Sequence, residues 1–385
     1  MAIGLSLYLD ILRFLLALIV LLSHARAQAW TGGILWRTEF FAQPAVIGFF
    51  VLSGFVIAYV TDHKEKDLRS YLASRAARLY SVIVPALALT LVVDAWGWHS
   101  FPWNYGYNPL GDEAAQPLLR YLGALLMLTS MGVVGYPTGE LHVFFPPGTN
   151  WPFWSLSNEL IYYLFFAIWL FVRKPRAYAL YVLLAFFAGV EIMALFPLWI
   201  LGVLTYKATR RYTPGAFSGG AMFLLSALAG LYICMQVDGI WQQKTLLSRA
   251  LHQDYVIGVL VALNIFGASQ LRLFDRILPA AAGVIRWLGL LTFPLYLCHR
   301  PLLHFFSGVQ VAVPGSWLQN LYLFGAVFLV TAALTVLSER LRASLRKLLG
   351  AKRAVDAMTS AATESVAAIA PTPTKPPDPA ASRPS

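Results

Sequence analysis

The first hydrophobic stretch of the chain, LYLDILRFLLALIVLLSHA, carries three ionisable side chains, Asp10, Arg13 and His24. His24 follows Arg13 by eleven residues. At about 100° per residue, a helix returns over that distance to within roughly 20° of the same face, about 16 Å further along its axis. Asp10 lies one turn before Arg13, so all three share one stripe. Ionisable groups within a bilayer usually face a bundle interior or a wet cavity, which makes this stripe a candidate site.

The same three residues allow a second interpretation. Asp10 and Arg13 would then neutralise each other near one membrane surface, and His24 would lie at the opposite interface. This stretch alone does not decide between a site and a pair of interfacial anchors.

Two arginines, Arg75 and Arg78, precede a proline-containing apolar segment in SRAARLYSVIVP. Their spacing places two guanidinium groups about one helical turn apart. Each guanidinium offers a planar fork of donors, so the pair would suit phosphate groups. Anchoring of basic residues at the cytoplasmic surface also accounts for them, and both interpretations stay open.

A carboxylate, Glu159, lies within the aromatic-rich segment WPFWSLSNELIYYLFF (151–166). If Ser155 or Ser157 caps a helix there, Glu159 lies about one turn inside the bilayer and needs a cation, hydroxyls or water as a partner. The spacing from Ser155 to Glu159 misses that of a capping box. Capping is therefore an incomplete account of Glu159.

Two further stretches combine apolar residues with polar or small ones. In GFFVLSGFVIAY (48–59), Gly48, Ser53 and Gly54 would let either another helix or a ligand approach the backbone closely. In FPLYLCHRPLLHFF (293–306), snorkelling to the interface explains Arg300 better than it explains the nearby histidines, His299 and His304.

Composition places the chain in the membrane class. Hydrophobic residues make up 58% of it and charged residues 12%, a larger apolar share than soluble domains have. The net charge of +11 comes from short basic runs between apolar segments, which is typical of the positive-inside rule and does not indicate nucleic-acid binding. We expect an all-α, polytopic membrane protein.

Neither a metal centre nor a disulfide is expected from the two cysteines, Cys234 and Cys298, because both lie in apolar stretches without metal-like spacing. HARAQA (24–29) resembles a signal-peptidase site, but no basic region precedes the apolar run and charged residues interrupt it. We therefore expect the first span to be retained.

Ten apolar segments are long enough to cross about 30 Å of hydrocarbon. They lie near residues 6–24, 45–62, 78–97, 153–173, 176–192, 195–209, 216–236, 254–271, 284–306 and 319–339. The segment 121–136 is ambiguous. With a cytoplasmic N-terminus, the basic loops and the basic tail are all cytoplasmic only if this segment does not cross. We therefore predict ten crossings, cytoplasmic termini and a re-entrant or interfacial segment at 121–136.

The chain divides into three regions by composition. Residues 1–340 form the predicted transmembrane domain, and residues 341–353 form a basic cytoplasmic segment next to the membrane. Residues 354–385 are rich in alanine and proline and are expected to be a disordered cytoplasmic tail. No internal repeat is evident, which weakens the case for a transporter built from inverted halves.

Taken together, these motifs resemble those of acyltransferase family 3. The resemblance rests on Arg13 and His24 in an R-x10-H arrangement, FFVLSGFVIAY, the Arg75 and Arg78 pair, WSLSNE and YLCHRP, in that order. It covers about residues 5–340 and implies an integral protein of the cytoplasmic (inner) membrane. Members of this family transfer acyl groups from acyl-CoA to hydroxyls of surface or secreted carbohydrates. Asn158 and the flanks of His299 depart from the usual pattern, which puts the acceptor in doubt but not the chemistry.

That resemblance, with the chemistry of acyl transfer, predicts a role for each residue of the first group. The reaction needs a base for the hydroxyl, donors for an oxyanion and anchors for a polyanionic donor. His24 is the candidate base. Arg75 and Arg78 would hold the phosphates of coenzyme A, while Arg13, held by Asp10, would orient the donor or stabilise charge.

Less specific roles are expected for a second group of residues. Glu159 would orient either His24 or the acceptor. Ser53 is expected to contact the acyl-CoA donor, and Ser53 and Tyr163 are candidate oxyanion donors. The residues expected to contact the acceptor are Trp154, Ser157 and His299. The expected partners are acyl-CoA, most simply acetyl-CoA, as co-substrate, a free or lipid-linked carbohydrate, and membrane lipid; no bound cofactor, metal or nucleic acid is expected.

Two other classes compete with the enzyme. A carrier or flippase for a polyanionic lipid or sugar would use the same ionisable stripe to line a path and would leave its substrate chemically unchanged. A purely structural scaffold would give no reason for Arg13, His24 and Glu159 to lie within apolar segments.

Overall fold

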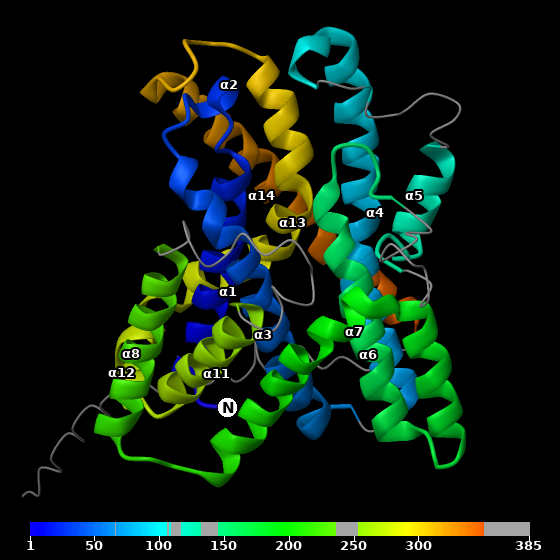
Figure 1. Ribbon diagram of the computed structural model, residues 1–385, viewed down its shortest axis with the longest axis vertical. Helices are drawn as coiled ribbons and strands as arrows, with labels where there is room; N and C mark the ends of the chain where they lie inside the picture. Colours follow the sequence, from blue (N-terminus) through cyan, green and yellow to red (C-terminus); the bar gives the residue numbers. More distant parts are fainter. Residues whose placement is uncertain (66, 106–107, 109–116, 132–144, 236–252, 350–385) are drawn as a thin grey trace, which may run out of the picture.

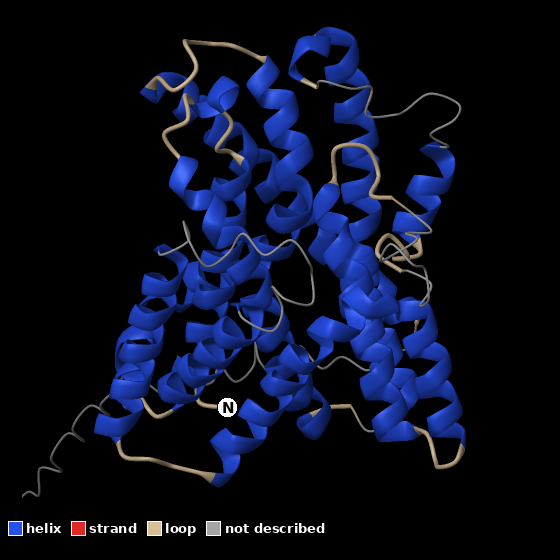
Figure 2. Cartoon of the chain, in the orientation of Figure 1, coloured by secondary structure: helices blue, strands red, loops and turns tan. Residues whose placement is uncertain are grey.

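The computed structural model describes residues 1–65, 67–105, 108, 117–131, 145–235 and 253–349. Over these ranges the chain folds into helices joined by loops and contains no strand (Figure 2), which confirms the all-α prediction. The α-helices are α1 (Ile3–His24), α2 (Gln28–Thr31), α3 (Ala42–His63), α4 (Leu68–Ser100), α5 (Pro117–Leu125), α6 (Trp154–Phe171), α7 (Arg176–Arg211), α8 (Ala216–Met235), α11 (Tyr255–Ser269), α12 (Arg272–Ile277), α13 (Ala282–Gly308) and α14 (Trp317–Leu348). Short 3-10 helices cover Trp36–Phe41, Pro102–Asn104, Trp151–Phe153 and Leu278–Ala281.

Seven helical segments in the described ranges are long and apolar enough to cross a membrane. They are Ile3–His24, Trp36–His63, Leu68–Ser100, Arg176–Arg211, Ala216–Met235, Arg272–Gly308 and Trp317–Leu348. The chain is therefore a polytopic membrane protein, as its composition predicts, while the number of ten crossings stays a prediction. The shorter helices α6 and α11 cover the two predicted spans near 153–173 and 254–271.

Helix α7 joins two of the predicted spans, 176–192 and 195–209, in one element. The join is interrupted at Gly189, whose φ of 79° and ψ of 172° are not helical, a conformation that glycine adopts without steric cost. Figure 1 shows the helix turning sharply between its two halves. Both predicted segments are therefore helical, while their separate crossings stay a prediction and the bend that connects them was not predicted.

Small residues allow α3 and α7 to cross closely. A Cβ added at Gly54 would meet the backbone oxygen of Trp199, and one added at Gly202 would meet the backbone oxygen of Val51. Such contacts are typical of helix pairs packed through glycine in membranes. Of the two interpretations of Gly54, close approach of another helix is the one the structure supports.

Several connections that carry basic residues lie at one end of the molecule. In Figure 1 the chain start, the region between α3 and α4, and the α6–α7 and α7–α8 connections all lie toward the lower end. Helix α12 lies against the start of α1, where Asp275 Oδ1 accepts a 2.7 Å hydrogen bond from the Gly4 amide. This arrangement agrees with basic loops on one side of the membrane, and which side they face stays a prediction.

Two predicted segments are only partly described. Helix α5 lies beside the upper half of α4 in Figure 1 and is 9 residues long, too short to span the hydrocarbon. The rest of the predicted re-entrant segment, from residue 132, lies outside the described residues. Helix α14 continues through Leu348 into the predicted basic segment, and the predicted disordered tail lies outside the described residues.

Candidate functional site

A cavity of about 690 Å³ opens between α1, α3, α4, α6 and α13. Most of its wall is apolar, contributed by phenylalanine, leucine, valine and isoleucine side chains. Its polar lining residues are Arg13, Ser53, Arg78, Ser155, Glu159, Tyr163, Thr292 and Tyr296. The cavity thus gathers residues from all five of the polar stretches that the sequence singles out.

Glu159 is held by hydroxyl groups on the wall of this cavity. Ser53 donates to its Oε1 over 3.3 Å, and the Tyr163 hydroxyl donates to the same oxygen. Ser53 in turn accepts from the indole Nε1 of Trp199 at 3.3 Å. A hydroxyl has one proton to donate, and Ser53 and Tyr163 both donate theirs to Glu159. This arrangement does not favour either as the oxyanion donor, and it places Glu159 with hydroxyls and not with His24.

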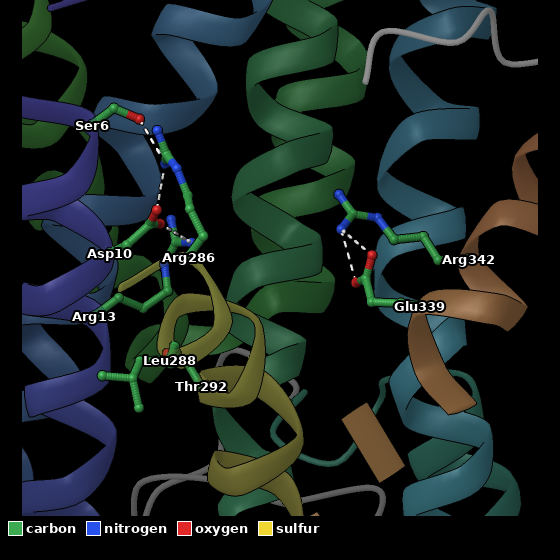
Figure 3. Close-up of polar contacts among 8 residues, drawn as sticks. All are labelled: Ser6, Asp10, Arg13, Arg286, Leu288, Thr292, Glu339 and Arg342. Atoms are coloured by element: carbon green, nitrogen blue, oxygen red, sulfur yellow. Dashed lines mark hydrogen bonds and ion pairs between the residues drawn. The ribbon is translucent and has the colours of Figure 1, made fainter. Parts of the chain in front are cut away.

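The Asp10 carboxylate has a closer partner than the predicted one. Arg286 of α13 lies 2.5 Å from Asp10 Oδ2 and donates to Ser6 Oγ over 2.9 Å, whereas Arg13 Nη1 lies 3.6 Å from Asp10 Oδ1 (Figure 3). Arg13 also interacts electrostatically with Glu159 and with Arg78. Asp10 therefore joins α1 to α13 and holds Arg13 only in part, which leaves the Arg13 guanidinium among the cavity-lining groups.

This ion pair gives a prediction about stability. Arg286→Ala removes the closer partner of a largely buried carboxylate, so we expect a loss of about 1 to 3 kcal/mol. The double variant Arg286→Ala/Asp10→Asn removes the uncompensated charge and should recover part of the loss. Thermal unfolding in detergent, followed by loss of monodisperse protein, measures both. Equal midpoints for wild type and Arg286→Ala would show that the pair contributes nothing.

A second cavity, of about 530 Å³, adjoins the first. Arg13, Arg78 and Phe293 line both cavities, so the two share a wall. The remaining polar lining of the second cavity is Ser81, Thr335, Ser338, Glu339 and Arg342. Glu339 accepts from Arg342 Nη1 at 3.1 Å on one face of α14 (Figure 3). Three guanidinium groups with one carboxylate give this cavity an excess of positive charge.

More positive charge lies at the same end of α14. Arg346 interacts electrostatically with Arg75 and Arg78. Burial lowers the pKa of Lys64, just beyond α3, and the Arg346 guanidinium lowers the pKa further. This region would therefore attract a polyanion.

The side chains of Arg75 and Arg78 do not face the same space. Arg75 is buried, forms an ion pair with Glu65 and lies 4.9 Å from the Tyr71 ring centroid. It is not among the lining residues of either cavity, whereas Arg78 lines both. Residues three apart on a helix point about 60° away from each other, and Glu65 draws Arg75 to its own side. Of the pair, only Arg78 is placed to meet a ligand in these cavities.

His24 lies at the end of α1 and contacts α13. Its Nδ1 is 3.0 Å from the backbone oxygen of Val20 and 3.0 Å from Nε2 of His299. His304, on the same helix as His299, packs edge-on against Trp30 with ring centroids 4.6 Å apart. Tyr296, which lines the first cavity, has its ring centroid 6.2 Å from that of His299. Tyr296 thus lies between the cavity and the pair formed by His24 and His299.

Two residues expected to meet the acceptor are occupied by packing. Ser157 is fully buried, contacts Thr129 Oγ1 at 3.2 Å and accepts from the Ser130 amide at 3.3 Å. Trp154 lies edge-on to Phe50 with ring centroids 6.4 Å apart. Both help to hold the start of α6 in place, and their contact with an acceptor stays a prediction.

Comparison with protein families matches residues 6–340 to an acyltransferase domain. Comparison with curated proteins and with solved structures yields no match. The family match covers nearly the whole chain, including the first cavity, the histidine pair and every lining residue of the second cavity except Arg342. This polytopic chain therefore belongs to acyltransferase family 3 and is a membrane acyltransferase.

Proposed function

We propose that this enzyme transfers an acyl group, most simply acetyl, from cytoplasmic acyl-CoA to a hydroxyl of a surface or secreted carbohydrate. The observation that carries the proposal is the pair of adjoining cavities, one rich in arginine and one mostly apolar, that share Arg13 and Arg78. An acyl donor with a phosphate-bearing end and a long uncharged arm would fit the arginine-rich cavity with the first part and the apolar cavity with the second. The cytoplasmic membrane, with both termini in the cytoplasm, is the location that fits such a donor.

In this proposal the arginine-rich cavity binds the phosphates of coenzyme A. Arg78 and Arg342 come from two different helices, α4 and α14, and face the same space. Guanidinium forks bind phosphate oxygens through two donors each. The pantetheine arm then runs past Arg13 into the apolar cavity, where the thioester lies near α6 and α13.

The chemistry assigned to His24 is general base catalysis. Its Nε2 takes the proton of the acceptor hydroxyl while that oxygen attacks the thioester carbonyl carbon. The new carbon–oxygen ester bond forms, the carbon–sulfur bond breaks, and the proton passes from His24 to the departing thiolate of coenzyme A. Arg13, with its positive charge on the cavity wall, is placed to stabilise negative charge that develops during the attack.

Donor binding gives a prediction that separates the arginines. Arg78→Lys and Arg342→Lys keep the charge but lose the fork, so each should raise the KM for acetyl-CoA about tenfold and change kcat little. Arg75→Lys is the matched control on the same helix, because its partner is Glu65; it should lower thermal stability and leave KM near wild type. Steady-state kinetics of purified variants decides between them. An unchanged KM in Arg78→Lys and Arg342→Lys would remove the donor from this cavity.

Mass spectrometry of carbohydrates from cells with and without the gene tests the reaction class. Loss of O-acetyl esters on deletion, and their return with wild type but not with Arg78→Ala, supports acyl transfer. A glycan that keeps every ester but changes its amount at the cell surface would instead support a carrier, which moves its substrate without covalent change.

A further inference from the structure

A hydrogen bond between two histidines joins the ends of α1 and α13. His299 Nε2 lies 3.0 Å from His24 Nδ1, and the ring centroids are 5.0 Å apart. His299 is fully buried. A neutral imidazole can act as donor at one nitrogen and acceptor at the other, so the neighbours of each ring decide which nitrogen carries the proton.

Backbone carbonyls determine the proton position on His299. Its Nδ1 lies 2.7 Å from the oxygen of Tyr296 and 3.1 Å from the oxygen of Leu295. Carbonyl oxygens accept and never donate, so Nδ1 carries the hydrogen. The Nε2 of neutral His299 therefore holds a lone pair and faces His24 as an acceptor.

The same reasoning assigns the proton on His24. Its Nδ1 meets two acceptors, the Val20 oxygen at 3.0 Å and the His299 Nε2 at 3.0 Å. Nδ1 must therefore be the protonated nitrogen, and the lone pair of His24 lies on Nε2. That nitrogen is the one left to take a proton from a substrate hydroxyl.

We infer that His299 is a positioning residue for His24: it orients the ring with Nε2 as the base and accepts from Nδ1 when His24 becomes positively charged. This inference rests on the proposed role of His24 as general base. Arg300 and Arg26 interact electrostatically with His24 and oppose a positive charge there. The neutral Nε2 of His299 offsets this repulsion by accepting a hydrogen bond from the charged His24. Hydrogen bonds from charged donors are stronger than neutral ones, and the low dielectric of the buried pair strengthens them further.

These contacts replace the acceptor-binding role expected for His299. Both of its ring nitrogens are engaged, one by backbone carbonyls and one by His24. With no exposed surface, His299 has neither a free nitrogen nor an open face for a carbohydrate.

Three substitutions at position 299 test the inference. His299→Gln can place an amide oxygen near the Nε2 position and accept from His24, while His299→Asn is too short to reach and His299→Leu has no acceptor. With labelled acetyl-CoA and de-O-acetylated carbohydrate from the source cells, we expect kcat to fall roughly 10- to 100-fold in the Asn and Leu variants. The Gln variant should retain most of kcat, and the KM for acetyl-CoA should stay within about twofold in all three. An unchanged kcat in His299→Leu would overturn the inference, as would an equal loss in all three variants.

The proton positions are measurable without turnover. In protein labelled with 15N-histidine, the His24 signal, identified by its loss in His24→Ala, should show a protonated Nδ1 and a bare Nε2. The opposite assignment would overturn the inference whatever the activity. If wild type transfers no acetyl group while this assignment holds, the proposed function fails and the histidine geometry stands, so the two failures are distinguishable.

Discussion

His24→Ala should reduce acyl transfer by about 100- to 10,000-fold while the protein still inserts and accumulates. The reduction follows from loss of the general base, whose contribution in enzymes spans that range. Insertion should not suffer, because replacing an ionisable side chain with alanine lowers the cost of placing the helix in the membrane. Initial rates with labelled acetyl-CoA, at matched amounts of purified protein, measure the effect.

His24→Gln and His63→Ala complete this test. Glutamine preserves hydrogen bonding but cannot take up the proton, so it should be nearly as inactive as alanine. His63 makes the same local contact as His24, from Nδ1 to the backbone oxygen four residues earlier, at 2.9 Å, but lies at the far end of α3. His63→Ala should therefore retain wild-type rates. Substantial transfer by His24→Gln would exclude His24 as the base and turn attention to His304.

Glu159→Leu should be the second most damaging change, with kcat lower by roughly 100-fold. The carboxylate holds Ser53 and Tyr163 and lies in electrostatic contact with Arg13. Without it, the buried Tyr163 and the partly buried Ser53 lose the acceptor of their hydroxyls, and Arg13 loses a counter-charge on the cavity wall. Glu159→Gln keeps an acceptor oxygen but no charge, so its kcat should lie between that of Glu159→Leu and that of wild type. Kinetics with both substrates varied shows whether the loss is in kcat.

Ser53→Ala is the matched control for Glu159. It removes one of the two hydroxyls and leaves the charge, so we expect at most a severalfold loss. A loss in Ser53→Ala as large as that in Glu159→Leu would mean that the hydroxyl network, and not the carboxylate charge, is what the reaction needs.

Hydropathy and motif order were sufficient to predict the helical membrane fold and the family. Long apolar segments can be predicted from the local sequence alone, because each is stable as a helix in lipid without contacts to other segments. The bend of α7 at Gly189 was not predictable in the same way, since glycine is also common in unbroken membrane helices. The local sequence around 189 gives no signal that the helix axis turns there.

The site was predictable as a set of residues but not as a set of contacts. Arg13, Arg78, Glu159 and Ser53 come from four separate stretches that the sequence singled out and all line one cavity, whereas Asp10 and His24 of the first stripe are not among its lining residues. The partners of Asp10 and His24, however, are Arg286 and His299, each more than 270 positions away along the chain. Periodicity places residues on a face of their own helix and says nothing of which helix that face meets.

Arg75 and Arg342 show two limits of what residue spacing alone can predict. The spacing of Arg75 from Arg78 predicted a shared phosphate site, but Glu65 holds Arg75 in an ion pair away from the cavities. Arg342 lies in the basic run ERLRASLRK, which the charge distribution assigned to topology, yet it lines the arginine-rich cavity. Its position three residues after Glu339, on the same helical face, was the available signal.

The most direct test of the central claim is transfer in a reconstituted system. Purified protein in proteoliposomes is given acetyl-CoA labelled in the acetyl group and de-O-acetylated carbohydrate from the source cells. The proposed function predicts an alkali-labile labelled ester on the carbohydrate and one free thiol of coenzyme A released per ester, with both absent in His24→Ala and in Arg78→Ala at low acetyl-CoA. Carbohydrate that crosses the bilayer without gaining label, or label transfer that His24→Ala leaves unchanged, would contradict it.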